Sequence, residues 1–369
     1  MNNSRYLFSY FFPFFLIAAT VPFTTHSANY ELMALEQGTA NSKPGLRHVP
    51  ERDIAIPTED VSSQVQVLIG APYLPFFNIH PESPAKWKEL VDMASAGAIA
   101  ELPSLKKQFG VTVTTKTIAG VKVFIITPNI IPEKNKNRLL VHVHGGGYVF
   151  GPGEAGIREA VLMAGFGGFK IISVDYRMPP DFPYPAALDD AMAVWKEAVQ
   201  MANPKNMAIF GSSTGGALTL AMTLRAKDEN LPLPAAIAPS TPWSDLADIG
   251  DSYETNEWID NILVTWDGWL GDAAKLYAGS YSMQNPYLSP IYGNFQGFPP
   301  AILTSGTRDL FLSNTVRTHR KLRRAGVEAD LNIYEGQSHN QFDINPEAPE
   351  AREVYTDIAN FFDKHLGSE

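Results

Sequence analysis

The chain contains no cysteine among its 369 residues. It therefore holds together without disulfide bonds, and it lacks the lipid-modified cysteine that anchors bacterial lipoproteins. Positive charge is also scarce, because 29 Lys and Arg stand against 39 Asp and Glu, for a formal net charge of −10. Nucleic-acid binding requires a basic surface that displaces counterions from phosphate. Nucleic acids are therefore not expected as partners.

Internal repeats and low-complexity tracts are absent as well, whereas hydrophobic residues make up 45% of the sequence. This content suffices to bury the core of one large domain or of two ordinary ones. The composition therefore predicts a globular protein.

The first 28 residues differ in composition from the rest. Arg5 precedes an uncharged run over residues 6–25 rich in Phe, Leu, Ile and Ala, and small residues follow around Ser27 and Ala28. This layout is typical of a secretory signal peptide cleaved near those small residues. An uncleaved membrane anchor is the alternative, because the run is about long enough to span a bilayer. We therefore expect an exported protein, periplasmic or secreted, without membrane insertion after cleavage.

From about residue 110 onward, strand-like and helix-like segments alternate, as in an α/β sheet covered by helices on both faces. Residues 111–118 and 121–127 flank the turn Ala119-Gly120 and predict an antiparallel hairpin. Short buried strands are predicted at 139–144, 170–175, 207–210, 235–238, 301–304 and 331–334, and helices at about 154–164, 187–201, 215–227, 314–325 and 349–366. The predicted fold is a mostly parallel sheet with an antiparallel start.

Two stretches lie outside this alternation. They are residues 29–109, with a helix from about Ser83, and residues 245–287, which carry Trp258, Trp266 and Trp269. Insertions of this kind on an α/β core are usually caps over a site, although extra packing is the alternative. We expect a signal peptide over 1–28, a cap segment over 29–109 and a catalytic domain over 110–369, with 245–287 as a cap insertion after the sixth strand.

A turn with the pattern G-x-S-x-G joins the strand at 207–210 to the next helix. Its residues are Gly211-Ser212-Ser213-Thr214-Gly215. A strand-to-helix turn of this type exposes a serine hydroxyl in a strained conformation, because the glycines carry no Cβ that would clash. Ser213 is therefore a candidate nucleophile.

A nucleophilic serine needs a histidine to take its proton and a carboxylate to orient that histidine. Asp309 and His339 both follow predicted strands, at the sheet edge where open α/β sheets bind ligands. The chain order Ser213, Asp309, His339 is the order of α/β hydrolases. Asp343, just beyond the histidine, is the alternative orienting carboxylate.

Negative charge develops on the attacked carbonyl oxygen and needs hydrogen-bond donors. The run His144-Gly145-Gly146-Gly147 follows the strand at 139–144, where lipases and esterases place an H-G-G-G loop. The backbone N–H groups of Gly145, Gly146 and Gly147, together with that of Thr214, are therefore the candidate oxyanion hole.

With these motifs the chain resembles the hormone-sensitive lipase family of α/β-hydrolase carboxylesterases over about residues 105–369. The matching segments are 144–147, 175–177, 183–190, the serine turn, Asp309 and His339. The resemblance implies an α/β-hydrolase fold, oxyanion donors chiefly at Gly146, Gly147 and Thr214, and a part of the acyl-pocket cap in the N-terminal segment. It also implies hydrolysis of short- to medium-chain esters through an acyl-enzyme, without metal or cofactor.

Three positions depart from the family pattern. Ser212 and Thr214 flank the nucleophile where the family usually has Asp or Thr and then Ala, and Asn340 follows the histidine where glycine is frequent. None of these changes removes a catalytic group. We expect the side chain of Thr214 to narrow the site and to affect acyl preference.

Other readings of the same residues are weaker. Residues 151–156 match G-x-G-x-x-G but begin seven positions after His144, too late for a dinucleotide loop. The pair His142 and His144 has the H-x-H pattern without further metal ligands. A lactone or amide hydrolase with the same triad remains an alternative, and a non-catalytic ligand receptor is disfavoured by the intact triad. The expected partner is a small-molecule ester, and the oligomeric state, including a dimer, stays open.

Overall fold

A single eight-stranded sheet organises the computed structural model, which describes Val49 and residues 51–367. The described residues from Ala55 onward form one compact unit. The strand order is β1-β2-β4-β3-β5-β6-β7-β8. The strands are β1 (Val111–Ile118), β2 (Val121–Pro128), β3 (Leu139–Val143), β4 (Lys170–Val174), β5 (Met207–Ser212), β6 (Ala236–Ser240), β7 (Ala301–Gly306) and β8 (Ala329–Tyr334).

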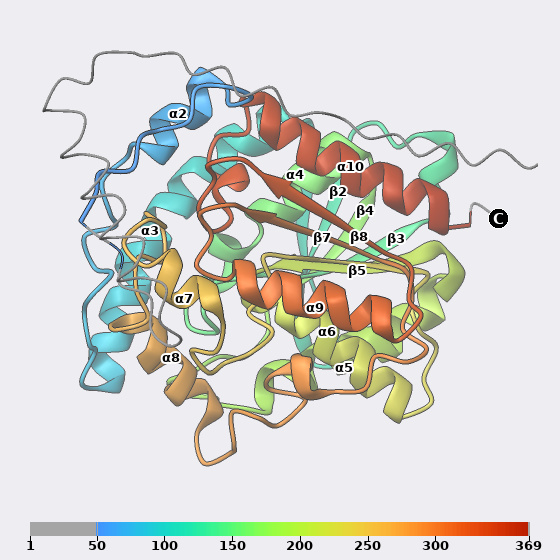
Figure 1. The fold of residues 1–369 in the computed structure, drawn as a ribbon. Coiled ribbons are helices and arrows are strands. Elements are labelled where there is room, and N and C mark those ends of the chain that lie inside the picture. Colours follow the sequence, from blue (N-terminus) through green and yellow to red (C-terminus); the bar gives the residue numbers. More distant parts are fainter. Residues whose placement is uncertain (1–48, 50, 368–369) are drawn as a thin grey trace, which may run out of the picture. The chain divides into compact units, whose positions relative to one another are not determined.

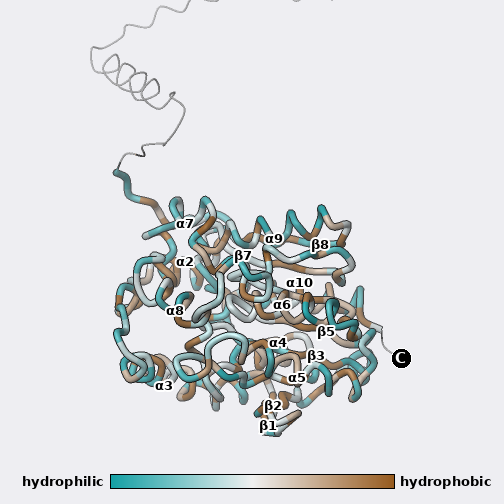
Figure 2. The backbone as a smooth tube through the Cα atoms, turned by 90° about the horizontal axis from the view of Figure 1, so that it is seen from below, coloured by the Kyte–Doolittle hydropathy of each residue, from teal (hydrophilic) through white to brown (hydrophobic). Residues whose placement is uncertain are grey.

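The sheet is mixed. The β1–β2 and β2–β4 pairs are antiparallel, whereas all other neighbouring pairs are parallel. Figure 2 shows β1 and β2 at one edge of the sheet and β7 and β8 toward the other. The predicted mostly parallel sheet with an antiparallel start is therefore confirmed.

Alternate residues of the central strands enter two separate cores, because successive side chains of a strand point to opposite faces. In β3, Val141 and Val143 pack in one core, and Leu140 packs in the other. All three side chains are fully buried. Both faces of the sheet are therefore covered, which explains why β3 reads as an unbroken apolar run.

Helices cover the two faces, as Figure 1 shows, with α4 and α10 on one side and α5, α6 and α9 on the other. Their bounds are α4 (Arg158–Gly167), α5 (Ala186–Met201), α6 (Thr214–Asp228), α9 (Leu312–Arg324) and α10 (Pro349–His365). Short 3₁₀ turns occupy Glu133–Asn135, Gly153–Gly156, Pro204–Asn206, Pro290–Tyr292 and Gln341–Asp343.

One predicted helix starts later than expected. The prediction placed it at about 154–164, but Gly153–Gly156 form a 3₁₀ turn and α4 begins at Arg158. The cause lies in the glycines. Gly156 leaves no room for a side chain, because a Cβ there would lie 2.4 Å from the Gly151 carbonyl oxygen. The strand predicted at 235–238 also begins one residue later and ends two residues later, as β6.

The two stretches outside the alternation carry helices of their own. The segment before the sheet contains α2 (Ser63–Ile69) and α3 (Pro84–Gln108), and the stretch after β6 contains α7 (Asp251–Thr255) and α8 (Trp269–Ala278). The hydroxyl of Ser83 accepts a hydrogen bond from Lys86 N, and Pro84 follows as the first helical residue. This cap fixes the start of α3 where the sequence predicts it.

The predicted signal peptide over residues 1–28 lies outside the described residues, so its prediction stays untested. Within the described ranges, none of the helices combines the length and the apolar character that a membrane span requires.

Candidate active site

Ser213 occupies a strained turn between β5 and α6. Its φ of 58° and ψ of −121° are unusual for a residue with a side chain and are typical of functional sites. The turn passes directly over β3, since a Cβ on Gly211 or Gly215 would lie 2.1 or 2.0 Å from the Val143 carbonyl oxygen. Only glycine fits at both positions, which explains the spacing of the motif.

The backbone of Ser213 is fixed by the neighbouring strand. Its N–H donates to the carbonyl of Ser240 at the end of β6, 2.9 Å away, and lies 3.3 Å from the Thr241 hydroxyl. The serine side chain is therefore presented from a rigid position at the carboxyl edge of the sheet.

Asp309 and His339 lie in hydrogen-bond contact although 30 residues separate them. The Nδ1 atom of His339 is 2.9 Å from Oδ1 of Asp309. Asp309 is fully buried and also accepts from the Ser305 hydroxyl (2.7 Å) and from Phe311 N (2.8 Å). The carboxylate is thereby held in place from two sides.

Asp343 does not contact the imidazole. Its carboxylate accepts from the Asn340 amide at 2.7 Å and from the Tyr355 hydroxyl. Asp309 and Asp343 are the two orienting carboxylates that the sequence predicts as candidates, and Asp309 is the one hydrogen-bonded to His339.

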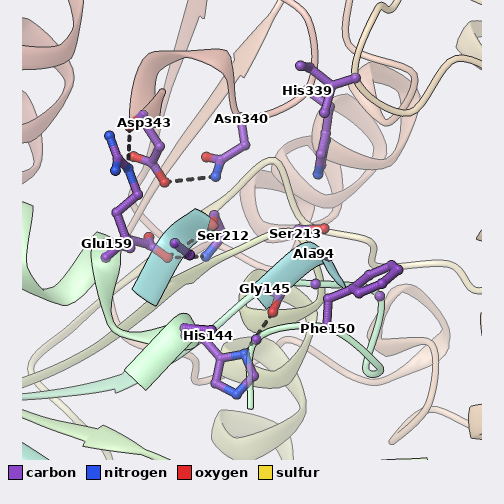
Figure 3. Close-up of a pocket in the computed structure, with 18 of the residues that line it drawn as sticks. Ala94, His144, Gly145, Phe150, Glu159, Ser212, Ser213, His339, Asn340 and Asp343 are labelled. Carbon is purple, nitrogen blue, oxygen red and sulfur yellow. Dashed lines mark hydrogen bonds between the residues drawn. The ribbon is translucent and has the colours of Figure 1, made fainter. Parts of the chain in front are cut away.

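The other ring nitrogen of His339 faces the pocket. Nε2 is buried and has no hydrogen-bond partner within the described part of the chain. Figure 3 shows the ring pointing toward Ser213, and both residues line the same cavity. Burial lowers the pKa of His339, but Asp309, and after it Asp260 and Asp343, raise that pKa above its ordinary value. The ring is thus suited to take up a proton.

The glycine loop after β3 lies beside the serine. Gly145, Gly146 and Gly147 line the cavity with Ser213, and Gly146 and Gly147 have φ values of 112° and 64°. A Cβ on Gly147 would lie 2.7 Å from the Trp269 ring, so the loop has no room for a side chain there. Thr214 begins α6, whose first N–H groups have no intrahelical acceptor. The four predicted oxyanion donors are therefore grouped around Ser213.

The cavity over Ser213 measures about 370 Å³. Its apolar wall includes Leu74, Ala94 and Ala98 from the segment before the sheet and Ile262, Leu263 and Trp269 from the insertion after β6, beside Phe150 and Ile344 from loops of the sheet itself. The covering stretches therefore shape the space that a substrate would occupy, as a cap does.

Ser212 is held by a buried acid that the sequence prediction missed. Glu159 Oε2 accepts from Ser212 N (3.1 Å) and from the Ser212 hydroxyl (3.0 Å), and His142 Nε2 is 3.1 Å away. Burial raises the pKa of Glu159 to about 7. A single acid within the otherwise apolar stretch 159–167 was the available signal. Ser212, which departs from the family pattern, therefore has a buried hydrogen-bond partner in Glu159.

Asp260 is the second buried acid that was missed. It lies between α7 and α8 and accepts hydrogen bonds from His339 N and Leu310 N. These contacts span 79 and 50 residues of sequence. No local pattern around Asp260 indicates them.

The rival motifs have structural roles. Within residues 151–156, Gly153 N donates to Asp175 at 2.8 Å, so the Asp175 carboxylate is hydrogen-bonded to the glycine loop itself. His142 contacts Ser173 and Glu159, whereas His144 stacks on Tyr176 with ring centroids 4.2 Å apart. The two histidines of the H-x-H pattern therefore serve different neighbours. The described residues contain no cluster of three or more His, Cys, Asp or Glu suited to a metal.

Comparison with known proteins gives consistent matches. Residues 140–343 match the family described as alpha/beta hydrolase fold. An acetyl-hydrolase of Streptomyces hygroscopicus is 28% identical over 222 residues, which cover 60% of this chain and 74% of that protein. An esterase of Acinetobacter venetianus is 27% identical over 245 residues, or 66% of this chain and 79% of that protein.

Solved structures give the same result. The crystal structure of an esterase E25 is 36% identical, with a TM-score of 0.83, and the match covers 86% of this chain and 98% of that one. An esterase from the bacterial hormone-sensitive lipase family is 25% identical, with a TM-score of 0.66, over 78% and 100% of the two chains.

Proposed function

The chain belongs to the alpha/beta hydrolase family, and we propose that Ser213, His339 and Asp309 form the triad with which it hydrolyses esters. Its relatives and structural neighbours are esterases, including members of the hormone-sensitive lipase family, and the chain is accordingly a carboxylic ester hydrolase. The finer assignment of residues and substrate is our proposal.

One observation carries the assignment of the triad. Nδ1 of His339 is hydrogen-bonded to Asp309. The other ring nitrogen, Nε2, is buried, has no hydrogen-bond partner among the described residues and points into the cavity that contains Ser213. A buried nitrogen without a partner is costly unless a ligand or a reacting group uses it. The strained backbone of Ser213 supports the same role for that residue.

The proposed reaction has two halves. Ser213 Oγ attacks the ester carbonyl carbon while His339 Nε2 takes the hydroxyl proton, and backbone N–H groups of Gly146, Gly147 and Thr214 stabilise the oxyanion. The C–O bond to the alcohol breaks, and His339 gives its proton to the leaving oxygen. Water then attacks the acyl-serine with His339 as base, which releases the acid and restores the serine.

The cavity supports a short- to medium-chain ester as substrate. Its volume of about 370 Å³ lies at the lower end of ligand pockets, and the covering stretches line it with apolar side chains. A panel of p-nitrophenyl esters from acetate upward, extended by a lactone and an anilide, measures the chain-length preference. Faster turnover of the lactone or the anilide than of every ester would favour the alternative activity instead.

The first test of the triad is removal of the nucleophile. We expect Ser213→Ala to lower kcat for p-nitrophenyl esters by roughly 10⁴- to 10⁶-fold while the protein stays folded. Ser244→Ala is a matched control that should keep near wild-type turnover, since Ser244 is also buried but its hydroxyl contacts Asn314 and Thr318 instead of the triad. Wild-type turnover by the Ser213→Ala variant would exclude this serine as the nucleophile.

We also propose that the protein is exported to the periplasm or secreted. The support is the layout of residues 1–28, with one basic residue, an uncharged run and small residues at its end. N-terminal sequencing of the protein recovered from a cell expressing the full chain tests this. A start near Ser27 or Ala28 supports export with cleavage, whereas an intact Met1 in the membrane fraction supports the anchor.

A further inference from the structure

We propose that Asp260, from the insertion after β6, is a positioning residue that orients His339 and supplies a second negative charge to it. The proposal rests on the proposed function, because it assigns a role within the same triad. It adds a fourth side chain, contributed by the covering insertion rather than by the sheet.

The contacts of Asp260 are unusually complete for one side chain. Its Oδ2 accepts from Leu310 N at 2.8 Å and from His339 N at 3.2 Å. Its Oδ1 accepts from Ile262 N at 2.8 Å and from Leu263 N at 3.1 Å. The residue is fully buried. Four backbone donors fix the carboxylate in position, and their hydrogen bonds offset part of the cost of burying its charge.

These four bonds join three separate segments. Leu310 follows Asp309 directly, His339 is the proposed base, and Ile262 and Leu263 belong to the apolar wall of the cavity. The Asp260 carboxylate thus fixes the loop that carries Asp309, the loop that carries His339 and the apolar wall of the cavity relative to each other. A displacement of about 1 Å in such an arrangement can lower a rate about 10²-fold.

The charge of Asp260 also acts on the imidazole. Three acids act on the imidazole of His339: Asp309 from the loop after β7, Asp260 from the insertion and, without contact, Asp343 from the 3₁₀ turn that follows His339. The rings of His339 and Phe311 pack in a T-shaped arrangement. Burial lowers the pKa of His339, and these three acids outweigh it. Burial and Asp309 in turn raise the pKa of Asp260 to about 6, so that Asp260 is charged at neutral pH.

This arrangement favours the transition state. When His339 holds the proton of Ser213, its buried ring is a cation that is attracted by the charges of Asp309 and Asp260. The second charge therefore stabilises the imidazolium more than the neutral ring. A scaffold role alone would involve the four backbone bonds but would leave the protonation of His339 unchanged.

The test compares Asp260→Asn with a matched control in the same insertion. Asp245 is equally buried, but it pairs with Arg317 (2.9 Å) and accepts from the Tyr292 hydroxyl, away from the triad loops. We expect Asp260→Asn to lower kcat about 10- to 100-fold with a KM changed less than about threefold. The acid limb of the pH profile, where kcat/KM falls as the pH decreases, should move to lower pH in this variant, because loss of the Asp260 charge lowers the pKa of His339.

Asp260→Glu keeps the negative charge but changes the length of the side chain. It should keep the acid limb at the wild-type pH, even if altered packing lowers kcat. Asp245→Asn should lower the melting temperature without moving the limb. If Asp260→Asn does not fold, Asp260→Ser replaces it as the neutral variant in the same comparison. An unmoved limb in the neutral variant overturns the proposal, whatever happens to stability.

The same data separate two kinds of failure. Loss of the proposed function would appear as absent ester turnover by the wild type or as full turnover by Ser213→Ala. Failure of the role proposed for Asp260 alone would appear as an active wild type, an inactive Ser213→Ala variant and an unchanged acid limb in Asp260→Asn.

Discussion

Two buried histidines flank the serine turn, and the structure treats them in opposite ways. His339 and His142 are both nearly inaccessible to solvent and each lies within hydrogen-bond distance of a carboxylate. The pKa of His339 is raised, whereas that of His142 is lowered to about 3. The same residue type in similar burial can therefore take up a proton near neutral pH on one side, whereas it stays neutral at that pH on the other.

The difference lies in the neighbouring acids. His339 lies close to Asp309 and Asp260, whose charges, with a smaller contribution from Asp343, outweigh burial. Asp343 also raises the pKa of His142, but burial outweighs it there. Around His142, burial dominates, and its partner Glu159 is itself raised to a pKa of about 7 by burial. The 3.1 Å contact between His142 and Glu159 has the geometry of an ion pair, but with a neutral ring it is a hydrogen bond. Charged neighbours, more than burial, decide which histidine can titrate.

The largest expected effect comes from removing the acid partner of His339. Asp309→Asn should lower kcat by about 10⁴-fold, because the amide no longer holds the correct tautomer of the imidazole or stabilises its cation. Asp343→Asn, the control, should lower kcat by less than about tenfold, since Asp343 contacts Asn340 and Tyr355 instead. Steady-state ester turnover of both variants measures this. A larger loss in Asp343→Asn would reverse the assignment.

The pH dependence follows from the raised pKa of His339. The ring must be neutral to take the proton of Ser213, so kcat/KM should fall about tenfold per pH unit below an acid limb that lies above pH 6.5 or so. A limb well below pH 6 would show that the acids around His339 do not act as described. A pH series of kcat/KM on one ester, with stability checked at each pH, provides the measurement.

Glu159 offers a test on the other side of the comparison. Its folded pKa is above the ordinary value, so its contribution to stability is present below about pH 4 and is lost as the pH rises toward 7. Glu159→Gln should remove on the order of 1–3 kcal/mol of this pH-dependent decline. Urea unfolding at pH 5 and pH 8 measures it, with the exposed Glu197→Gln on α5 as control. An equal decline in Glu159→Gln and the wild type would contradict the raised pKa.

The smallest effect is expected from His142 itself. Because its ring stays neutral and only bridges Ser173 and Glu159, His142→Gln should lower stability by about 1 kcal/mol and kcat by less than about threefold. It should leave the acid limb of kcat/KM unmoved. A shift of that limb in His142→Gln would mean that His142 takes part in the proton transfer.

Local chemistry explains why much of the fold and the site follows from the sequence. The glycines around Ser213 closely approach β3, and those of the H-G-G-G run closely approach Ser212, Phe150 and Trp269, so that none of them has room for a side chain. Asp309 and His339 follow strands of a parallel sheet, whose carboxyl ends meet at one edge. These features depend on short segments and on one topological rule.

The parts that escaped prediction depend on contacts between distant segments. Asp260 and Glu159 act through bonds to residues 50 or more positions away, and the sequence around Asp260 carries no mark of them. The start of α4 was predicted too early because the 3₁₀ turn before it depends on how closely Gly156 approaches Gly151. Tertiary packing decides such positions, and propensity does not encode it.

The central claim is that Ser213 carries the acyl group during turnover. Rapid acid quench of the wild type with a p-nitrophenyl ester, followed by peptide mass spectrometry, measures this directly. The account predicts an acyl adduct on the peptide that contains Ser213, and no adduct in Ser213→Ala. An adduct on any other residue, or steady turnover by Ser213→Ala, would contradict it.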